Sequence, residues 1–367
     1  MIQHDQYHCP GLHGPDSTME IHPKTMAQLL GEWQTLEIPI VQRRYCWTHS
    51  EVETWWQCVA GLNGLRNNRG VKAGEIRTGK AVFRERDENT LLVIDGQQRI
   101  TTTLLLCIAL RNEAVARRQE VTVVAINNVL FNATTTSRES SRIIPSYLDR
   151  DAYFALLETK IPPSSPSALV EAFAIFAAKA KTLNPSSIHE TFTNAIHKMS
   201  IMSILITTRD LQLCQVFQWL QEKSLLAETI LFNPTPGRNF GTLDIVRNLL
   251  LSNFMDCERD ELEKVYETAW LPFEMWFPRG SGDFDDFLVG FLGTEGCEGV
   301  ATVSRQKGVV GKPMPTVAQP GFDIREKPAV NLSGLDLYKA FVIAYTEKMK
   351  TMSPLEFLTE LQTLAQI

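Results

Sequence analysis

The chain has 367 residues, of which 44% are hydrophobic and 21% are charged, and its formal net charge is −6 at pH 7. These values are those of an ordinary globular protein with about two subdomains. The acidic balance excludes a basic coat protein for nucleic acid. It remains compatible with a local basic site, because recognition depends on where the charges lie.

The cysteines and the first residues of the chain indicate the cellular compartment in which the protein is expected. The seven cysteines are odd in number and scattered, which predicts reduced thiols inside a cell. No secretory signal is visible, and no Lys or Arg precedes Lys24, so an intact Arg-rich transit peptide is not expected. We expect a soluble intracellular protein, either cytoplasmic or, if a transit peptide has been removed, of the mitochondrial matrix. The longest apolar run, residues 100–110, is too short for a membrane span.

The first part of the chain alternates between helix and strand patterns. Residues 1–20 lack periodicity and predict a flexible arm. Helices are expected at 22–33 and at 49–65, the second capped by Thr48 or Ser50. Further along, we expect strands at 81–83 and 91–94, a helix from 98 to about 118, and a β-rich segment at 121–130. Residues 21–135 are therefore predicted to form an α/β (α+β) subdomain.

The second part, residues 136–367, is predicted to be a mostly helical subdomain. One strand is expected at 201–207, and an exposed loop rich in Gly, Pro, Thr and Lys at about 293–330. Helices are expected at 149–160, 166–183, 188–199, 211–226, 242–254, 260–270, 284–292, 335–349 and 354–365.

The most informative stretch is Val-Ile-Asp-Gly-Gln-Gln-Arg-Ile-Thr-Thr, residues 93–102. A β-branched pair, an Asp-Gly turn and an apolar run that follows predict a strand, a tight turn and the first turn of a helix. Polar side chains with many donors thus gather where free backbone N–H groups and the positive end of the helix dipole point outward. Such a place suits an anion, of which phosphate is the usual one.

This segment resembles the Asp-Gly-Gln-Gln-Arg motif in the N-terminal domain of GmrSD-type restriction proteins, a family related to the ParB/sulfiredoxin fold. Ile-Pro-Ile-Val-Gln-Arg-Arg-Tyr-Cys-Trp, residues 38–47, resembles a second family motif, with Val41 in place of the usual Tyr. Weaker similarities are seen at 78–83, at 142–150 and at 243–248.

The resemblance implies a ParB/sulfiredoxin-like N-terminal subdomain, over whose motif cleft a helical subdomain closes. It implies nucleotide binding, with Mg²⁺ accompanying a nucleoside triphosphate, and places Asp244, Arg247 and Asn248 near the nucleotide. These three residues share a helix face or lie beside it. The Asn that the family carries before this helix is replaced or displaced, to Asn233 in our reading, which weakens the case for hydrolysis. Many relatives also carry an HNH nuclease domain, and no segment of this sequence resembles one.

Arg99 and Arg43 are the principal candidates for phosphate ligands. A guanidinium grips two phosphate oxygens with its planar fork, and each charge-assisted bond contributes roughly 1.5–3 kcal/mol. The two arginines belong to the two best-matched motifs and should face one cleft. The alternative is that Arg99 pairs with Asp95 and serves only to lock the fold.

The other polar residues of the motifs each have a functional and a structural interpretation. Gln42, Gln97 and Gln98 would contact a base, ribose or water, or bridge backbone groups, and we expect one of them to be structural. Asp95 would hold Mg²⁺ or, slightly favoured, accept N–H bonds in its own turn. Gly96 supplies a positive φ or a close approach of the backbone. The remaining predicted ligands are two hydroxyls that would cap the helix or touch phosphate, Thr101 and Thr102.

Two further clusters carry less weight. His4, His8, Cys9 and His13 fit no zinc spacing well, and we predict no metal site there. The aromatic residues Tyr45, Trp47, Trp55 and Trp56 could stack on bases, although aromatic side chains on a helix face more often belong to the core.

Two function hypotheses follow from these observations, both with nucleic acid and other protein subunits as partners in a hetero-oligomer. The first is a nucleotide-binding, NTP-hydrolysing specificity component of a defence system against modified DNA, whose nuclease lies on another subunit. The second is a non-catalytic module that holds an RNA 5′-triphosphate end, like the guide-RNA-binding subunits of kinetoplastid mitochondrial editing complexes. A purely structural subunit with a vestigial pocket is the third and least favoured interpretation.

Overall fold

The computed structural model describes residues 19–62, 76–132, 136–163, 166–207, 241–254, 259–277, 282–294 and 334–366, and the statements below concern these residues. They belong to two compact units, Met1–Asn239 and Phe240–Ile367, which are described separately. The helix expected at 211–226 lies outside the described residues, as do residues 1–18 of the arm expected at 1–20 and residues 295–330 of the loop expected at about 293–330.

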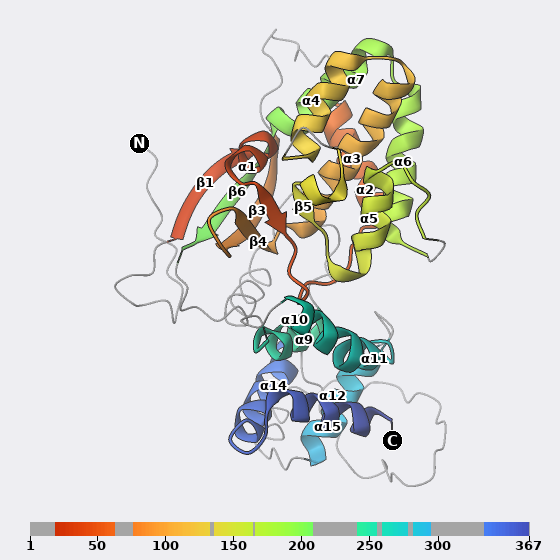
Figure 1. Ribbon diagram of the computed structural model, residues 1–367. Helices are drawn as coiled ribbons and strands as arrows, with labels where there is room; N and C mark the ends of the chain where they lie inside the picture. Colours follow the sequence, from red (N-terminus) through yellow and green to blue (C-terminus); the bar gives the residue numbers. More distant parts are fainter. Residues whose placement is uncertain are drawn as a thin grey trace, which may run out of the picture. The chain divides into compact units, whose positions relative to one another are not determined.

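The first unit contains a mixed sheet of six strands in the order β1-β6-β3-β4-β2-β5 (Figure 1). Strands β1 and β6, and likewise β3 and β4, pair antiparallel, whereas β6–β3, β4–β2 and β2–β5 are parallel. Together with the helices of this unit, the sheet confirms the predicted α/β class. The strands are β1 (Met19–Thr25), β2 (Thr35–Glu37), β3 (Ile76–Glu85), β4 (Thr90–Asp95), β5 (Ile143–Ile144) and β6 (Met199–Ile206).

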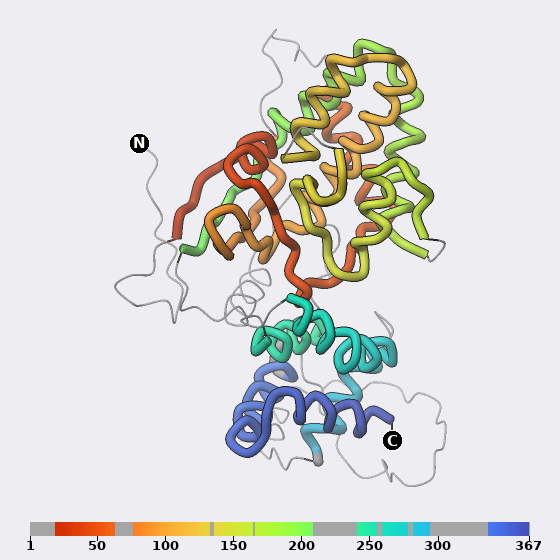
Figure 2. Tube along the Cα trace, in the orientation of Figure 1, coloured from red at the N-terminus to blue at the C-terminus, as the bar shows by residue number. Residues whose placement is uncertain are grey.

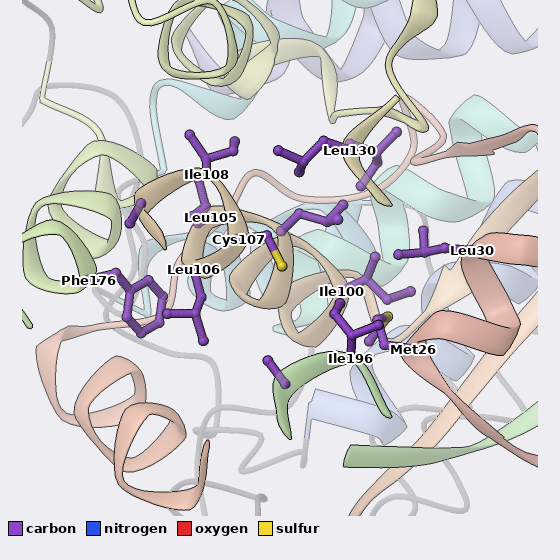
Figure 3. Close-up of a cluster of buried hydrophobic side chains, with 14 of the residues drawn as sticks. Met26, Leu30, Ile100, Leu105, Leu106, Cys107, Ile108, Leu130, Phe176 and Ile196 are labelled. Atoms are coloured by element: carbon purple, nitrogen blue, oxygen red, sulfur yellow. The ribbon is translucent and has the colours of Figure 1, made fainter. Parts of the chain in front are cut away.

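The core of this unit is built around helix α3 (Gln97–Ala116), whose residues 100 and 104–110 are almost completely buried. Figure 3 shows Leu106 of this helix beside Phe176, and Ile100 beside Met26 and Ile196. The other helices are α1 (Met26–Glu32), α2 (His49–Ala60), α4 (Glu120–Leu130), α5 (Arg150–Leu157), α6 (Ala168–Thr182) and α7 (Pro185–Thr193), with the π-helical turn η3 (Asn194–Lys198) and the 3₁₀ turns η1 (Arg138–Ser140) and η2 (Tyr147–Asp149).

The helix predicted at 22–33 is half wrong, because its first residues form β1. Thr25 ends this strand and starts α1: its hydroxyl accepts the N–H of Gln28, and the Gln28 amide oxygen accepts the N–H of Thr25. This reciprocal cap fixes the helix start at Met26. Pro23 is tolerated in β1 because the strand lies at an edge of the sheet.

The β-rich segment predicted at 121–130 is also wrong, since these residues form α4. Its valines favour a strand locally, but Thr122, Ile126 and Leu130 recur at helical spacing and are buried. The helix packs against α3, so tertiary burial of this one face overrides the β propensity.

The predicted subdomain boundary at 135 does not coincide with the division between the compact units. Strands β5 and β6 follow residue 135 in sequence, yet both join the sheet, and β6 lies between β1 and β3. Helices α6 and α7 pack against α3. The tube in Figure 2 follows this return of the chain, in green, to the first strand. The first unit therefore needs residues well beyond 135 to complete its sheet and core.

The second unit is helical in its described part. Phe273, Phe277, Phe284 and Phe287 form its aromatic cluster, with ring centroids 5.2–6.2 Å apart. Among the described helices of the chain, none combines the length and apolar character that crossing a bilayer requires. The helices are α9 (Thr242–Ser252), α10 (Arg259–Val265), η4 (Tyr266–Trp270, π-helical), α11 (Leu271–Glu274), α12 (Asp283–Thr294), α14 (Gly334–Lys348) and α15 (Pro354–Ala365).

Candidate functional site

The candidate site lies where β4 passes into α3. Gly96 is the N-cap of α3 and has φ +96°, in the left-handed region that favours glycine. A Cβ at this position would lie 2.6 Å from Cβ of Ala81 on the neighbouring strand β3. Gly96 is thus required both for its backbone conformation and for the close approach of the turn to the sheet, as predicted.

Asp95 stabilises this turn, in agreement with the favoured interpretation. Its Oδ1 accepts the N–H of Gly96 at 2.7 Å, and its Oδ2 lies 3.8 Å from Nη2 of Arg99. The carboxylate therefore already neutralises part of the guanidinium charge.

Arg99 is held chiefly by backbone carbonyls of β3. Nη1 donates to the carbonyl of Thr78 at 2.8 Å, and Nη2 donates to that of Lys80. The side chain is only 15% exposed, and burial lowers the pKa of Arg99 while the nearby Asp95 acts in the opposite direction. These contacts match the fold-locking alternative, and phosphate binding by Arg99 stays a prediction.

The carbonyls that Arg99 binds belong to an irregularity in β3. Two residues, Thr78 and Gly79, stand opposite the single residue Ile201 of β6, and Gly79 has φ +103°. A bulge of this kind interrupts the regular ladder, leaving carbonyls that need other donors. Arg99 supplies them, and the Thr78 hydroxyl donates across the same interruption to the carbonyl of Ser200 at 2.9 Å.

All three glutamines of the motifs bridge to the backbone, whereas we expected only one to do so. Nε2 of Gln42 donates to the carbonyl of Ile94 at 2.5 Å. Nε2 of Gln97 donates to the carbonyl of Arg43 at 2.7 Å. Gln98 accepts the N–H of Cys46 at 3.0 Å and donates to the carbonyl of Arg44 at 3.4 Å. Residues 42–46 of the second motif, which we call the strap, are thereby fastened across the start of α3.

Tyr45 secures the middle of the strap. Its N–H donates to Oδ2 of the buried Asp149 at 2.5 Å, and the same oxygen accepts the hydroxyl of Ser146 at 2.6 Å. The phenol oxygen of Tyr45 lies 2.8 Å from Oγ1 of Thr102. Burial raises the pKa of Tyr45 well above its usual value. The weak motif around residue 149 thus has a structural role, because Asp149 holds the strap at Tyr45.

Thr101 and Thr102 do not cap α3, because the helix already begins at Gln97 and both residues lie in its second turn. The Thr102 hydroxyl donates to the carbonyl of Gln98 at 2.7 Å as well as contacting Tyr45. The Thr101 hydroxyl is buried, and no described residue provides a hydrogen-bond partner for it.

Three basic residues belong to the segments whose backbone carbonyls are bound by side chains at this helix start. Arg43 and Arg44 are half-buried on the strap, and Lys80, whose own carbonyl accepts a hydrogen bond from Arg99, is exposed on β3. Nη2 of Arg44 donates to the carbonyl of Pro166 at 3.2 Å. We did not predict Arg44 or Lys80 as site residues. Arg44 lies inside the second motif, so its place at the site could have been predicted from the sequence. Lys80 belongs to the site only because of the bulge in β3, which the sequence does not reveal.

The late predicted cluster belongs to the second unit, so its position relative to α3 is not defined. Arg247 is 1% exposed, with Nη2 2.5 Å from Asp244 and Nη1 2.7 Å from Glu274. Burial by itself lowers the pKa of Arg247, but the carboxylates of Glu274 and Asp244 outweigh it and raise the pKa. Oε2 of Glu274 also accepts the indole N–H of Trp270 at 2.6 Å. Asn248 is buried, and its Oδ1 has no hydrogen-bond partner among the described residues.

The remaining candidates are the aromatic residues, the N-terminal His and Cys residues, and Asn233. Tyr45, Trp47, Trp55 and Trp56 are at most 8% exposed, as expected for core side chains. His4, His8, Cys9 and His13, like Asn233, lie outside the described residues. Within the described part of the chain, no group of three or more His, Cys, Asp or Glu side chains is arranged to hold a metal ion.

Comparison with known families agrees with the two motifs. The family model described as GmrSD restriction endonuclease, N-terminal domain, matches residues 26–230, more than half of the chain. The chain belongs to this family. No curated protein matches it.

The GmrSD match has a clear relation to the site. It includes the strap, the β3 bulge, the turn at Gly96 and all of α3. It ends before α9, so Asp244, Arg247 and Asn248 lie beyond the matched residues. The junction of the strap with the start of α3 therefore lies within the residues that the family model matches.

Proposed function

We propose that this protein binds a polyphosphate group at the start of α3, either in a free nucleoside triphosphate or at the 5′-triphosphate end of a nucleic acid. Arg43 is the principal side-chain ligand, assisted by the backbone N–H groups of the first turn of α3 and by its helix dipole. Arg99 acts mainly by holding the turn against β3.

The observation that carries this proposal is the 2.7 Å bond from Gln97 to the carbonyl of Arg43. It brings a residue of the strap to the first residue of a 20-residue helix. An anion at this helix end gains both the dipole and a neighbouring guanidinium, whose fork suits phosphate oxygens. Arg44 and Lys80 are two further basic residues whose carbonyls are bound by side chains of the same helix start.

Mg²⁺ fits this site only as a companion of the phosphate. Asp95 is the one motif carboxylate here, and its two oxygens already face the N–H of Gly96 and the Arg99 guanidinium. Mg²⁺ keeps several waters and is held through one or two carboxylates together with substrate phosphates. Asp95 would hold such an ion, which would neutralise phosphate charge.

The glutamine contacts favour binding without turnover. Gln42, Gln97 and Gln98 all use their amides on backbone groups, and an amide engaged in this way is a poor candidate for orienting a water against a terminal phosphate. This supports a non-catalytic subunit that holds and protects a guide-RNA 5′ end in a mitochondrial RNA-editing complex. The family membership instead supports a nucleotide-binding specificity component of a defence system against modified DNA.

Binding measurements with matched ligands test the proposal. We expect 5′-triphosphorylated RNA to bind more tightly than the same RNA with a 5′-hydroxyl, or Mg-GTP or Mg-ATP to bind, at a fixed salt concentration. Arg43→Ala should lower the affinity about tenfold or more and reduce its salt dependence, because a charge-assisted phosphate contact is lost. Release of phosphate from GTP or ATP would identify an NTPase; binding of the RNA end without release would identify the protective subunit.

The matched control is Arg118→Ala, which removes an exposed arginine just beyond the opposite end of α3. This variant should bind like the wild type. Equal affinity for the two RNA ends, together with no binding of either nucleotide, would refute the proposal.

A further inference from the structure

We infer that Gln97 is a positioning residue: its amide acts on the ligand only through Arg43, by holding the strap at the start of α3. This inference rests on the proposed function and names a residue on which that function depends. It differs from the expectation that the glutamine touches the base, ribose or water.

The geometry of Gln97 supports an indirect role. The side chain is buried with 5% exposure, and its Nε2 donates to the carbonyl of Arg43 at 2.7 Å. A buried amide nitrogen directed at a backbone carbonyl fixes that backbone position, since a carbonyl left without its donor in a buried site is unfavourable.

The other strap contacts act on neighbouring residues. Gln42 fixes the strap to β4 at Ile94, and Gln98 fixes Arg44 and Cys46. Tyr45 is held by Asp149 and Thr102. Within the part of the chain that the structure describes, the bond from Gln97 joins α3 to the carbonyl of Arg43 itself. Loss of the Gln97 amide should therefore loosen the backbone at Arg43, while the strap stays attached on either side.

A double-mutant cycle separates this role from direct contact with the ligand. The probe is 5′-triphosphorylated RNA, with the 5′-hydroxyl RNA as background and Mg-GTP as a second arm. Gln97→Met keeps the length and apolar volume of the side chain but removes the donor. We expect it to weaken triphosphate binding several-fold, less than Arg43→Ala does.

In the Arg43→Ala background, Gln97→Met should cause no further loss, because the residue through which it acts is gone. Gln97→Glu should weaken binding at least as much as Gln97→Met, since a carboxylate cannot donate to the carbonyl and its charge also repels the phosphate. Gln57→Met, the same change at an exposed position of α2, should leave affinity unchanged. Urea unfolding of each variant shows whether the fold is retained.

The outcomes are distinguishable. If Gln97→Met and Arg43→Ala weaken binding independently and their fold-changes multiply, Gln97 contacts the ligand itself and the inference is wrong. An unchanged affinity of Gln97→Met beside a weakened Arg43→Ala would also overturn it. If the wild type shows no preference for the triphosphate and Arg43→Ala changes nothing, the proposed function fails first.

Discussion

Gly96 shows how a single residue decides the geometry of the site. Its positive φ and its approach to Ala81 each exclude a side chain, and together they place the start of α3 against β3. Any other residue would need a strained backbone and a displaced strand. We therefore expect that replacing a polar side chain of the site disturbs its geometry less than adding a methyl group at Gly96 does.

Gly96→Ala should lower the free energy of unfolding by about 2 kcal/mol or more, because strain in the left-handed region adds to the overlap with Ala81. Gly31→Ala is the matched control: it lies in α1, and a Cβ there meets nothing within 4 Å. This control should be neutral or stabilise by about 0.5 kcal/mol through helix propensity. Urea denaturation compares the two variants, and equal effects would contradict this account of Gly96.

The sequence predicts the role of a residue best where the local backbone geometry requires that residue type. The conformation of Gly96 and the turn contact of Asp95 were predictable because local backbone geometry requires them. The partners of the three glutamines were not, since an amide serves equally well on a ligand or on a backbone carbonyl. The partner that each amide binds depends on contacts between segments more than fifty positions apart in sequence.

At the scale of elements, the β propensity of the valines in α4 opposes the helical structure that packing favours. Val121 and Val124 are 79% and 58% exposed, so their β-branched side chains gain little from burial there. The buried face of the helix decides the structure despite them. The same conflict explains why a local pattern predicted a strand here, while helices with a cleaner apolar stripe, such as α9 and α15, were predicted correctly.

Replacing these two valines by alanine should stabilise the protein by about 0.5 kcal/mol each, because alanine loses less side-chain freedom in a helix. The contrasting variant is Ile126→Ala on the buried face, expected to destabilise by about 2–5 kcal/mol through lost packing. Chemical denaturation of the three variants provides the test. A marked loss of stability in Val121→Ala or Val124→Ala would show that these side chains are covered in solution.

At the scale of the whole molecule, the chain divides into two compact units with separate cores. The first is organised around α3, and the second around clustered aromatic residues that include Phe341 and Phe357. The sheet order could not be read from the sequence, because β6 joins β1 and β3 from a distance of more than a hundred residues. Local patterns carry no information on such pairings.

We expect urea unfolding to show two transitions, as is common for chains with more than one core. Leu106→Ala should lower one midpoint and Phe357→Ala the other, since each opens a cavity in one fully buried cluster. Tryptophan fluorescence and far-ultraviolet circular dichroism follow the transitions. Both substitutions shifting a single common transition would show that the units unfold as one.

The extra residue in β3 couples two positions that are about twenty apart in the chain. Arg99 is needed at its place because Thr78 and Gly79 together face one residue of β6, leaving carbonyls for the guanidinium to bind. If evolution removed one residue between Arg77 and Lys80, the ladder would become regular and the arginine would lose its acceptors. In related sequences that descend from this chain, we expect a deletion at this position to be accompanied by the replacement of Arg99.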